Sequence, residues 1–165
     1  MRVNNLDAIA RWTPFATKNG AGDVTPADRP DVDFWFASRS VVANAHLLCF
    51  ACGGDGSLLA VQATDGRFEN GPVVHLGHEG EVFVIADDVP HALALIAASG
   101  DNYEGLIYAL TYNEAEPVEA DAGLAAFVKA QFDVELPTDA IAAIKATDAR
   151  LGEATRALIE RLNEG

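Results

Sequence analysis

The sequence has little of what several classes of protein require. Its 165 residues include two cysteines, too few for a disulfide framework. No run of about 18 apolar residues occurs, so no membrane span is expected. The first residues, MRVNNLDAIARW, lack an apolar signal-peptide core and a small-residue cleavage site. We therefore expect a cytoplasmic protein with no membrane partner.

Basic residues are also scarce. Eleven Lys and Arg residues face 25 Asp and Glu residues, giving a formal net charge of −14. Such a chain repels nucleic-acid phosphates, so no nucleic-acid partner is expected. No Lys or Arg lies between Arg67 and Lys129, whereas eleven acidic residues do. This acidic span is either a solvated surface that keeps the protein soluble or a surface that steers a basic protein towards it.

The rest of the composition is that of a globular protein. Half of the residues are hydrophobic and 22% are charged, which excludes disorder by composition. The length fits one domain with a hydrophobic core, and no linker is long or polar enough to separate two. We expect residues 1–165 to form a single domain.

The N-terminal region is expected to begin with a short helix and then a loop. Residues 5–13 are helical in pattern, with Asn4 or Asn5 as the cap and Pro14 as the end. The expected apolar face consists of Leu6, Ile9 and Ala10. Residues 19–33 contain two prolines and two glycines and are predicted to be a loop.

The middle of the chain is predicted to be rich in strands. The expected strands are FWFAS, His46–Cys52, SLLAVQA, PVVHLG and EVFVIA. Glycines that follow Asp, Asn or Glu separate most of them, and such glycines supply the positive φ of tight turns. They are Gly56, Gly66, Gly71 and Gly80. Short strands with turns every five to ten residues predict an antiparallel meander.

Helices are expected to follow the strands. Residues 87–99 are predicted to be helical, with Asp87 as the N-cap, Pro90 in the first turn and Gly100 as the stop. Residues 103–112 fit a helix or a strand. The stretch DAGLAAFVKAQF is helical in pattern, and residues 136–163 are predicted to be a long helical stretch with Thr138 as its cap, kinked or split at Gly152.

Together these elements predict an α+β fold. A bent, mainly antiparallel sheet is packed against helices, and the core sheet with its closing helix spans about residues 33–100. A helical C-terminal extension spans about residues 120–164.

Two sequence patterns could bind a metal ion or act in redox chemistry. Cys49 and Cys52 are spaced as C-x-x-C, and His75 and His78 follow later. In an extended strand, however, residues i and i+3 point to opposite faces, and the spacing does not match that of zinc fingers. A thioredoxin-like motif would lie at a helix N-terminus, but GGDG follows here. We interpret both cysteines as small buried hydrophobes and expect no metal and no cofactor.

Other candidate catalytic groups are weaker. GGDGS lacks the Lys-Ser/Thr pair of a phosphate-binding loop and is predicted to be a turn. No Ser or Cys lies in a nucleophile elbow. Asp87 and Asp88 have a sufficient structural role at the start of a helix. We therefore predict no catalytic residue; an enzyme using His75, His78 or Asp87 is the remaining alternative of this kind.

Residues 53–100 resemble the SUKH superfamily, the Smi/Knr-type domain of fungal cell-wall regulators and bacterial immunity proteins. The resemblance is carried by the GDGS turn before a strand, by GPVVHLGHEGE, and by the helix in VIADDVPHALALIA. The segment FVKAQFDVELPTDAIAAIK is similar to C-terminal extensions of some bacterial members. The Leu-Pro-x-x-Tyr segment that opens many members is absent.

The resemblance implies a non-enzymatic protein-binding domain. Most bacterial members look like immunity proteins, so the resemblance implies a toxin as the partner. If that toxin is basic, electrostatic attraction would guide it onto an acidic inhibitor. The alternative is a scaffold or regulatory protein with a non-toxin partner. Charge alone selects the candidate contact residues, together with one aromatic anchor: Trp35, Glu79, Glu81, Asp101, Glu104, Glu114 and Glu116.

Overall fold

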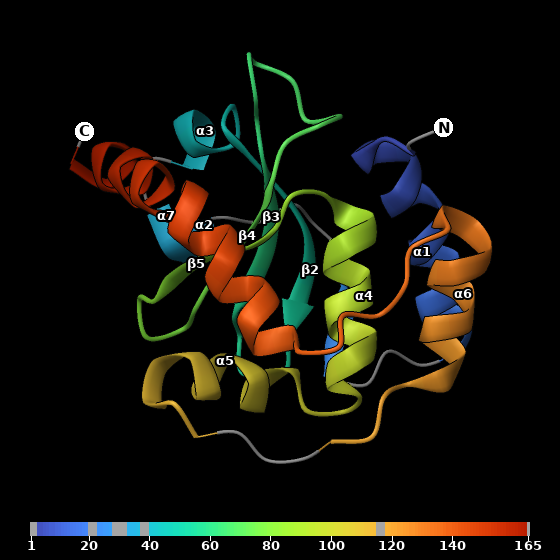
Figure 1. Cartoon of the computed structure of the whole chain (residues 1–165). Coiled ribbons are helices and arrows are strands. Elements are labelled where there is room, and N and C mark those ends of the chain that lie inside the picture. Colours follow the sequence, from blue (N-terminus) through green and yellow to red (C-terminus); the bar gives the residue numbers. More distant parts are fainter. Residues whose placement is uncertain (1–2, 20–22, 28–32, 37–39, 115–117, 165) are drawn as a thin grey trace.

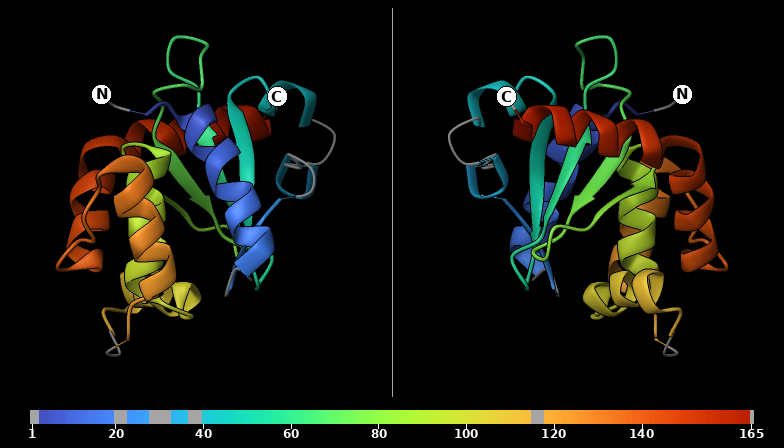
Figure 2. Two further views of the ribbon diagram at one scale, coloured as in Figure 1. Left: turned by 90° about the vertical axis from the view of Figure 1, so that its right-hand side faces the viewer. Right: turned by 90° about the vertical axis from the view of Figure 1, so that its left-hand side faces the viewer.

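The structure is a computed structural model and describes residues 3–19, 23–27, 33–36, 40–114 and 118–164. In this part of the chain, one antiparallel sheet has the strand order β1-β2-β3-β4-β5, with helices on both of its faces (Figures 1 and 2). The strands are β1 (Val24–Pro26), β2 (Leu47–Gly53), β3 (Leu58–Gln62), β4 (Val73–Leu76) and β5 (Val82–Ala86). The helices are α1 (Asn5–Asn19), α2 (Asp33–Phe36), α3 (Ser40–Ala43), α4 (Val89–Ser99), α5 (Tyr103–Tyr112), α6 (Ala122–Phe132) and α7 (Ala140–Glu164). The predicted α+β class with an antiparallel sheet is confirmed.

The meander forms where the sequence predicts it. Strand β2 pairs with β3, β3 with β4, and β4 with β5. Gly56, Gly66 and Gly80 have the positive φ expected of turn glycines. Gly71 has a different role, because a Cβ at this position would collide with the Gln62 carbonyl oxygen. Glycine therefore marks the ends of these strands for two reasons: some turns need a positive φ, and at Gly71 the backbone of Gln62 comes too close for a side chain.

Both faces of the sheet are buried, because side chains alternate between two cores. On β3, Leu59 and Val61 pack on the side of α1 and α4, which we call the α4-side core. Leu58 and Ala60 point the other way, towards Ile159 and other residues of α7, into the α7-side core. Burial on both sides explains why the strands read as nearly continuous apolar runs.

A β-bulge in β2 changes the direction of the cysteines. The pairing of β2 with β3 shifts between Cys49 and Ala51. As a result, Phe50 and Ala51 both lie in the α4-side core, whereas Cys49 and Cys52 both contact the α7-side core. The prediction that the two cysteines face opposite sides is therefore wrong. The prediction of small buried hydrophobes is confirmed for Cys49, while Cys52 is half-buried.

Helix α1 is longer than predicted and uses a different face. It continues through Pro14 to Asn19, although proline removes one backbone hydrogen bond. Packing offsets this loss, because Trp12 is buried and lies edge-on to Phe50, while Phe15 stacks on Phe127 at 4.3 Å. The buried positions are Asn5, Ala8, Trp12 and Ala16, whereas Leu6 is exposed. Asn4 is the cap, since its side-chain oxygen accepts from the Asp7 backbone N–H.

Two further predictions for the first third of the chain are wrong. The aromatic residues of FWFAS were expected to form a strand, but Phe34 to Phe36 are helical and belong to α2, Asp33–Phe36. The last two residues of FWFAS lie outside the described residues. Phe36 is buried in the α7-side core, which shows that a short helix can bury this side chain as well as a strand could. Part of the expected loop forms β1, which pairs with β2 through Thr25 and Cys52.

Helix α4 is capped by the second of the two aspartates. Asp88, not Asp87, is the N-cap, and its carboxylate accepts from the His91 backbone N–H at 2.9 Å. Asp87 instead accepts two hydrogen bonds from Arg150 of α7. Gly100 ends the helix at φ 59°, as predicted. The helix is buried on nearly all sides, since the sheet, α1 and α6 surround it (Figure 2).

Helix α7 is part of the fold rather than an appendage. It lies against β5, the last strand of the sheet. The Asp148 carboxylate accepts from the Val84 N–H at 2.9 Å, and Arg156 donates to the Val82 carbonyl at 3.1 Å and to Asp148 at 3.0 Å. Side chains of α7 thus form hydrogen bonds with backbone groups of β5 that, as part of an edge strand, have no neighbouring strand on that side.

One local prediction for α7, its cap, is corrected, and one of the two alternatives for Gly152 is excluded. Asp139, not Thr138, accepts from a first-turn backbone N–H, that of Ala142. The helix is not split at Gly152 but continues through it, and its axis turns near the middle (Figure 2). Glycine at position 152 leaves room for the ends of the Asp148 and Arg156 side chains, which a Cβ there would push aside. None of the described helices combines the length and apolarity needed to cross a bilayer.

Candidate functional site

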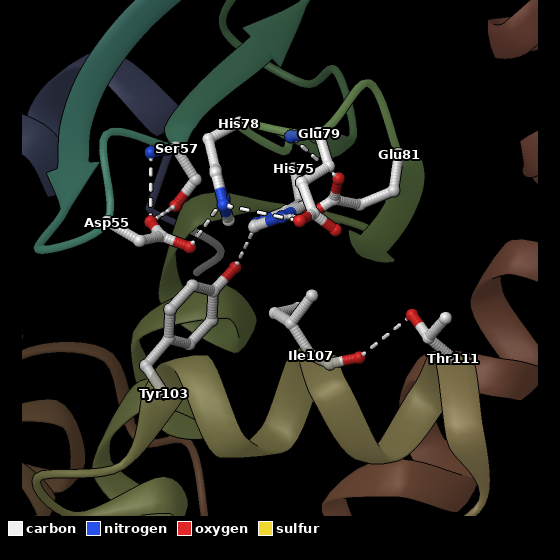
Figure 3. A network of polar contacts seen from close by, with 9 residues as sticks. All are labelled: Asp55, Ser57, His75, His78, Glu79, Glu81, Tyr103, Ile107 and Thr111. Carbon is white, nitrogen blue, oxygen red and sulfur yellow. Dashed lines mark hydrogen bonds and ion pairs between the residues drawn. The ribbon is translucent and has the colours of Figure 1, made fainter.

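Polar side chains gather at the end of the sheet where two turns meet. The β2–β3 turn carries Asp55, and the β4–β5 turn carries His78, Glu79 and Glu81. In a meander these two turns fall at the same end of the sheet. Helix α5 crosses below them, and Figure 3 shows its Tyr103 pointing up into the cluster. Segments almost 50 residues apart in sequence therefore form one polar site.

Asp55 organises the β2–β3 side of the cluster. One carboxylate oxygen accepts from the Ser57 N–H at 2.9 Å and from the Ser57 hydroxyl at 2.6 Å. The other lies 3.1 Å from His78 Nδ1. Burial alone would raise the pKa of the Asp55 carboxyl, but the Ser57 hydrogen bonds and the nearby histidines lower it below its ordinary value. Asp55 is therefore a carboxylate at neutral pH.

His75 lies behind this surface in the α4-side layer. Only 1% of its side chain is exposed, and its Nδ1 is 2.9 Å from the Tyr103 hydroxyl. Its Nε2 is buried without a hydrogen-bond partner among the described residues, and points at Glu81 Oε1 at 3.7 Å. Burial lowers the pKa of His75, although Glu81 and Asp55 oppose the shift, and burial raises the pKa of Tyr103 well above its ordinary value. Both groups are therefore neutral at pH 7.

The cluster does not have the connectivity of a nucleophilic triad. In such a triad, the imidazole bonds to the nucleophile and the carboxylate bonds to the imidazole. Here the Ser57 hydroxyl donates to the Asp55 carboxylate instead of contacting His78. Tyr103 is buried and its pKa is raised, so at neutral pH its hydroxyl is a neutral hydrogen-bonding partner of His75 and not an activated nucleophile. Among the described residues of this cluster, the serine hydroxyl is therefore not placed next to an imidazole that could activate it.

A surface with acidic and aromatic side chains lies in front of the cluster. We call it the acidic-aromatic face; it consists of Asp55, Glu79, Glu81, Glu104, Tyr108 and Tyr112. These residues line a cavity of about 630 Å³ together with His78 and parts of α5. Tyr108 and Tyr112 are 52% and 56% exposed, and their ring centroids are 4.5 Å apart. Large exposed aromatic pairs of this kind are typical of binding surfaces.

The negative charge of this face is not balanced within the described part of the chain. Its carboxylates have only histidine neighbours: His78 near Asp55 and Glu79, and His75 near Glu81. The ion pairs of lysine and arginine lie elsewhere, for example Arg156 with Asp148. Four carboxylates therefore lie beside two exposed tyrosines with no lysine or arginine partner among the described residues.

The structure brings together some of the predicted contact residues and separates others. Glu79, Glu81 and Glu104 share the acidic-aromatic face. Asp101 is exposed in the turn before α5, and Glu114 lines a neighbouring cavity of about 570 Å³ that shares Tyr108. Glu116 lies outside the described residues. Trp35 is half-buried against the α7-side core. Its helix, α2, lies apart from α5 in Figures 1 and 2, so Trp35 is not an anchor for this face.

Sequence reasoning missed the aromatic half of the face. Tyr108 and Tyr112 are four residues apart, and this spacing places two side chains on one side of a helix. The signal was hidden because residues 103–112 fitted a helix or a strand equally well. The structure shows a helix, α5, with Asn102 as its N-cap. Asp55 was missed for another reason: only the fold brings its turn next to His78.

The earlier alternative of a zinc site can also be compared with the structure. Within the described residues, no group of three or more His, Cys, Asp and Glu side chains is arranged to hold a metal ion. Cys49 and Cys52 contact the α7-side core, whereas His75 packs against Tyr103 and Phe83. The four residues thus do not share one site.

Comparison with known proteins gives no match: no family model matches the sequence, and no curated protein or solved structure matches the chain. The resemblance to the SUKH superfamily remains a prediction based on the turn, hairpin and helix motifs. The function is therefore argued from the site alone.

His75 is expected to make the protein less stable on acidification. Its pKa is below the ordinary 6.5 in the folded state, so between the two values the unfolded chain binds more protons. The stability is fully present above pH 6.5 and decreases as the pH falls towards the folded-state pKa. Urea unfolding at pH 7.5 and 5.5 should show a smaller loss in His75→Asn than in the wild type. The exposed His46→Asn is the control; equal losses in all three proteins would contradict the prediction.

Proposed function

We propose that this chain is a non-enzymatic protein-binding domain that holds a basic protein partner on its acidic-aromatic face. In its most specific form, the proposal is an immunity-type protein that neutralises a cognate toxin by covering it. The observation that carries the proposal is the juxtaposition of two groups of side chains. Four carboxylates have no lysine or arginine partner among the described residues, and beside them lie two exposed tyrosines whose ring centroids are 4.5 Å apart.

The physical reason lies in how such surfaces bind. Tyrosine supplies contact area with few rotatable bonds, and carboxylates select a cationic partner. The net charge of −14 would attract a basic protein over a distance and speed its association. A toxin that acts on nucleic acid is usually basic, so an acidic inhibitor is suited to cover it.

The test compares two variants of equal charge. The first is Glu79→Gln/Glu81→Gln/Glu104→Gln on the face. The second is Glu153→Gln/Glu160→Gln/Glu164→Gln on exposed positions of α7. Partners captured from host lysate are identified by mass spectrometry, purified and bound to each variant. We expect the face variant to bind the partner at least about ten-fold more weakly, with less salt dependence, and the α7 variant to bind like the wild type.

Neutralisation is then tested in cells. The captured protein should arrest growth when expressed alone, and the wild-type chain, but not the face variant, should restore growth. A partner that is harmless and belongs to a cellular complex would favour the scaffold or regulatory alternative. Equal binding by both charge variants would overturn the assignment of the face.

A further inference from the structure

We propose that the cavity of the acidic-aromatic face is a receptor for one arginine side chain of the bound protein. The inference depends on the proposed function only for the identity of the protein that supplies this arginine. It adds the chemical group that is recognised and the atoms that recognise it, and it can be tested with a small probe.

The cavity offers both kinds of contact that a guanidinium group makes. Its floor is α5, where Tyr108 and Tyr112 expose their rings one helical turn apart. Its rim is the pair of turns that carries Asp55, Glu79 and Glu81, and Glu104 approaches from the start of α5. A planar guanidinium group can stack on a tyrosine ring while its edge donates two parallel hydrogen bonds to a carboxylate. An ammonium group of lysine can do the first only weakly and the second not at all.

A second observation points to the same cavity. His75 Nε2 is buried, has no hydrogen-bond partner among the described residues, and is directed at Glu81 Oε1 from 3.7 Å (Figure 3). Glu81 in turn accepts from the Glu79 N–H at 3.1 Å and lines the cavity. The Glu81 carboxylate is thus placed between a buried neutral imidazole and the open cavity, with acceptor capacity left for a cation on the open side.

Within the described residues, no lysine or arginine is paired with the carboxylates of the cavity. The side chain nearest to Asp55 and Glu79 that can carry a positive charge is His78, which is 44% exposed and belongs to the rim itself. His75 is neutral at pH 7 because burial lowers its pKa. Between Arg67 and Lys129, which includes both the β4–β5 turn and α5, the chain has no lysine or arginine. Among the described residues, the ion pairs of lysine and arginine all lie away from this cavity, which leaves it open to an arginine of another molecule.

The probe for the test is the capped pentapeptide acetyl-Gly-Gly-Arg-Gly-Gly-amide. Binding is followed by two-dimensional amide NMR on the full-length protein at low salt. Matched peptides carry citrulline, which keeps the shape of arginine without its charge, or lysine. Matched proteins are Glu104→Gln and Tyr108→Ala on the face and Glu153→Gln on α7, all at exposed positions.

We expect the arginine peptide to shift signals of α5 and of the β4–β5 turn, and to bind at least about five-fold more tightly than the citrulline and lysine peptides. Glu104→Gln and Tyr108→Ala should each weaken binding about three- to ten-fold, and Glu153→Gln should leave it unchanged. Shifts spread over the whole acidic surface, or equal binding of the lysine peptide, would overturn the inference. The peptide experiment needs no toxin or other partner. The arginine site can therefore be confirmed even if the proposed function is wrong, and the proposed function can be confirmed even if the peptide does not bind.

Discussion

Replacing Asn5 by alanine is expected to lower the free energy of unfolding by about 3–5 kcal/mol, because two buried backbone groups and one part-buried group lose their hydrogen-bond partner at once. Asn5 is completely buried at the start of α1. Its amide nitrogen donates to the carbonyls of Phe68 and Gly71, both at 2.8 Å. Its oxygen accepts from the Val89 N–H at 2.8 Å. One side chain thus joins α1, the β3–β4 loop and the first turn of α4.

Urea unfolding monitored by circular dichroism measures this effect. Asn163→Ala at an exposed position of α7 is the matched control and should change the free energy of unfolding by less than about 0.5 kcal/mol. Asn5→Asp should also be strongly destabilising, because a carboxylate would face two carbonyl oxygens. A stable Asn5→Asp protein, or equal effects of the two alanine variants, would show that this hydrogen-bond network does not hold the elements together.

Removing Asp148 is expected to destabilise the fold by about 2–3 kcal/mol and to expose the edge of the sheet. The Val84 N–H would lose its acceptor, and Arg156 would lose its carboxylate while still lying against the Val82 carbonyl. Because both side chains are partly exposed, we assign most of the loss to the backbone hydrogen bond and little to the ion pair. An uncovered β5 should also promote association between chains.

Asp148→Ala is compared with Glu153→Ala, an exposed acid on the same helix. Chemical unfolding gives the stability, and size-exclusion chromatography at rising concentration gives the association. Asp148→Asn is expected to be intermediate, because its amide oxygen can still accept from Val84. If Asp148→Ala remains monomeric and as stable as Glu153→Ala, the side chains of α7 are not what protects the edge.

Local signals were enough to predict the central meander. The strands β2 to β5 are short apolar runs, and glycines at turn positions separate them, so each boundary is set by a few neighbouring residues. The capped helix that follows was predicted for the same reason. The error between Asp87 and Asp88 as N-cap is one residue, and either aspartate could accept from the first turn. A tertiary contact decides which aspartate is the N-cap: Asp87 accepts hydrogen bonds from Arg150, and Asp88 accepts from the first turn of α4.

Other elements were mispredicted where packing overrode local preference. Pro14 indicates a helix end, yet the burial of Trp12 and Ala16 on one face of α1 keeps the helix intact to Asn19. The aromatic residues before Phe36 have strand propensity, but form a single helical turn beside the α7-side core. In the same way, the bulge in β2 turned both cysteines to one side of the sheet, which no spacing rule foresees.

The sequence by itself determined the α+β class, the antiparallel order of the strands, and an acidic span without lysine or arginine, because turn glycines, apolar runs and charge are properties of neighbouring residues. Only the tertiary structure decided that His75 meets Tyr103 across 28 positions and that His78 meets Asp55. It also decided that α5 presents its two tyrosines beside the carboxylates of two separate turns. The physical reason is that such contacts depend on where a meander places its turns and on which helix closes that end of the sheet.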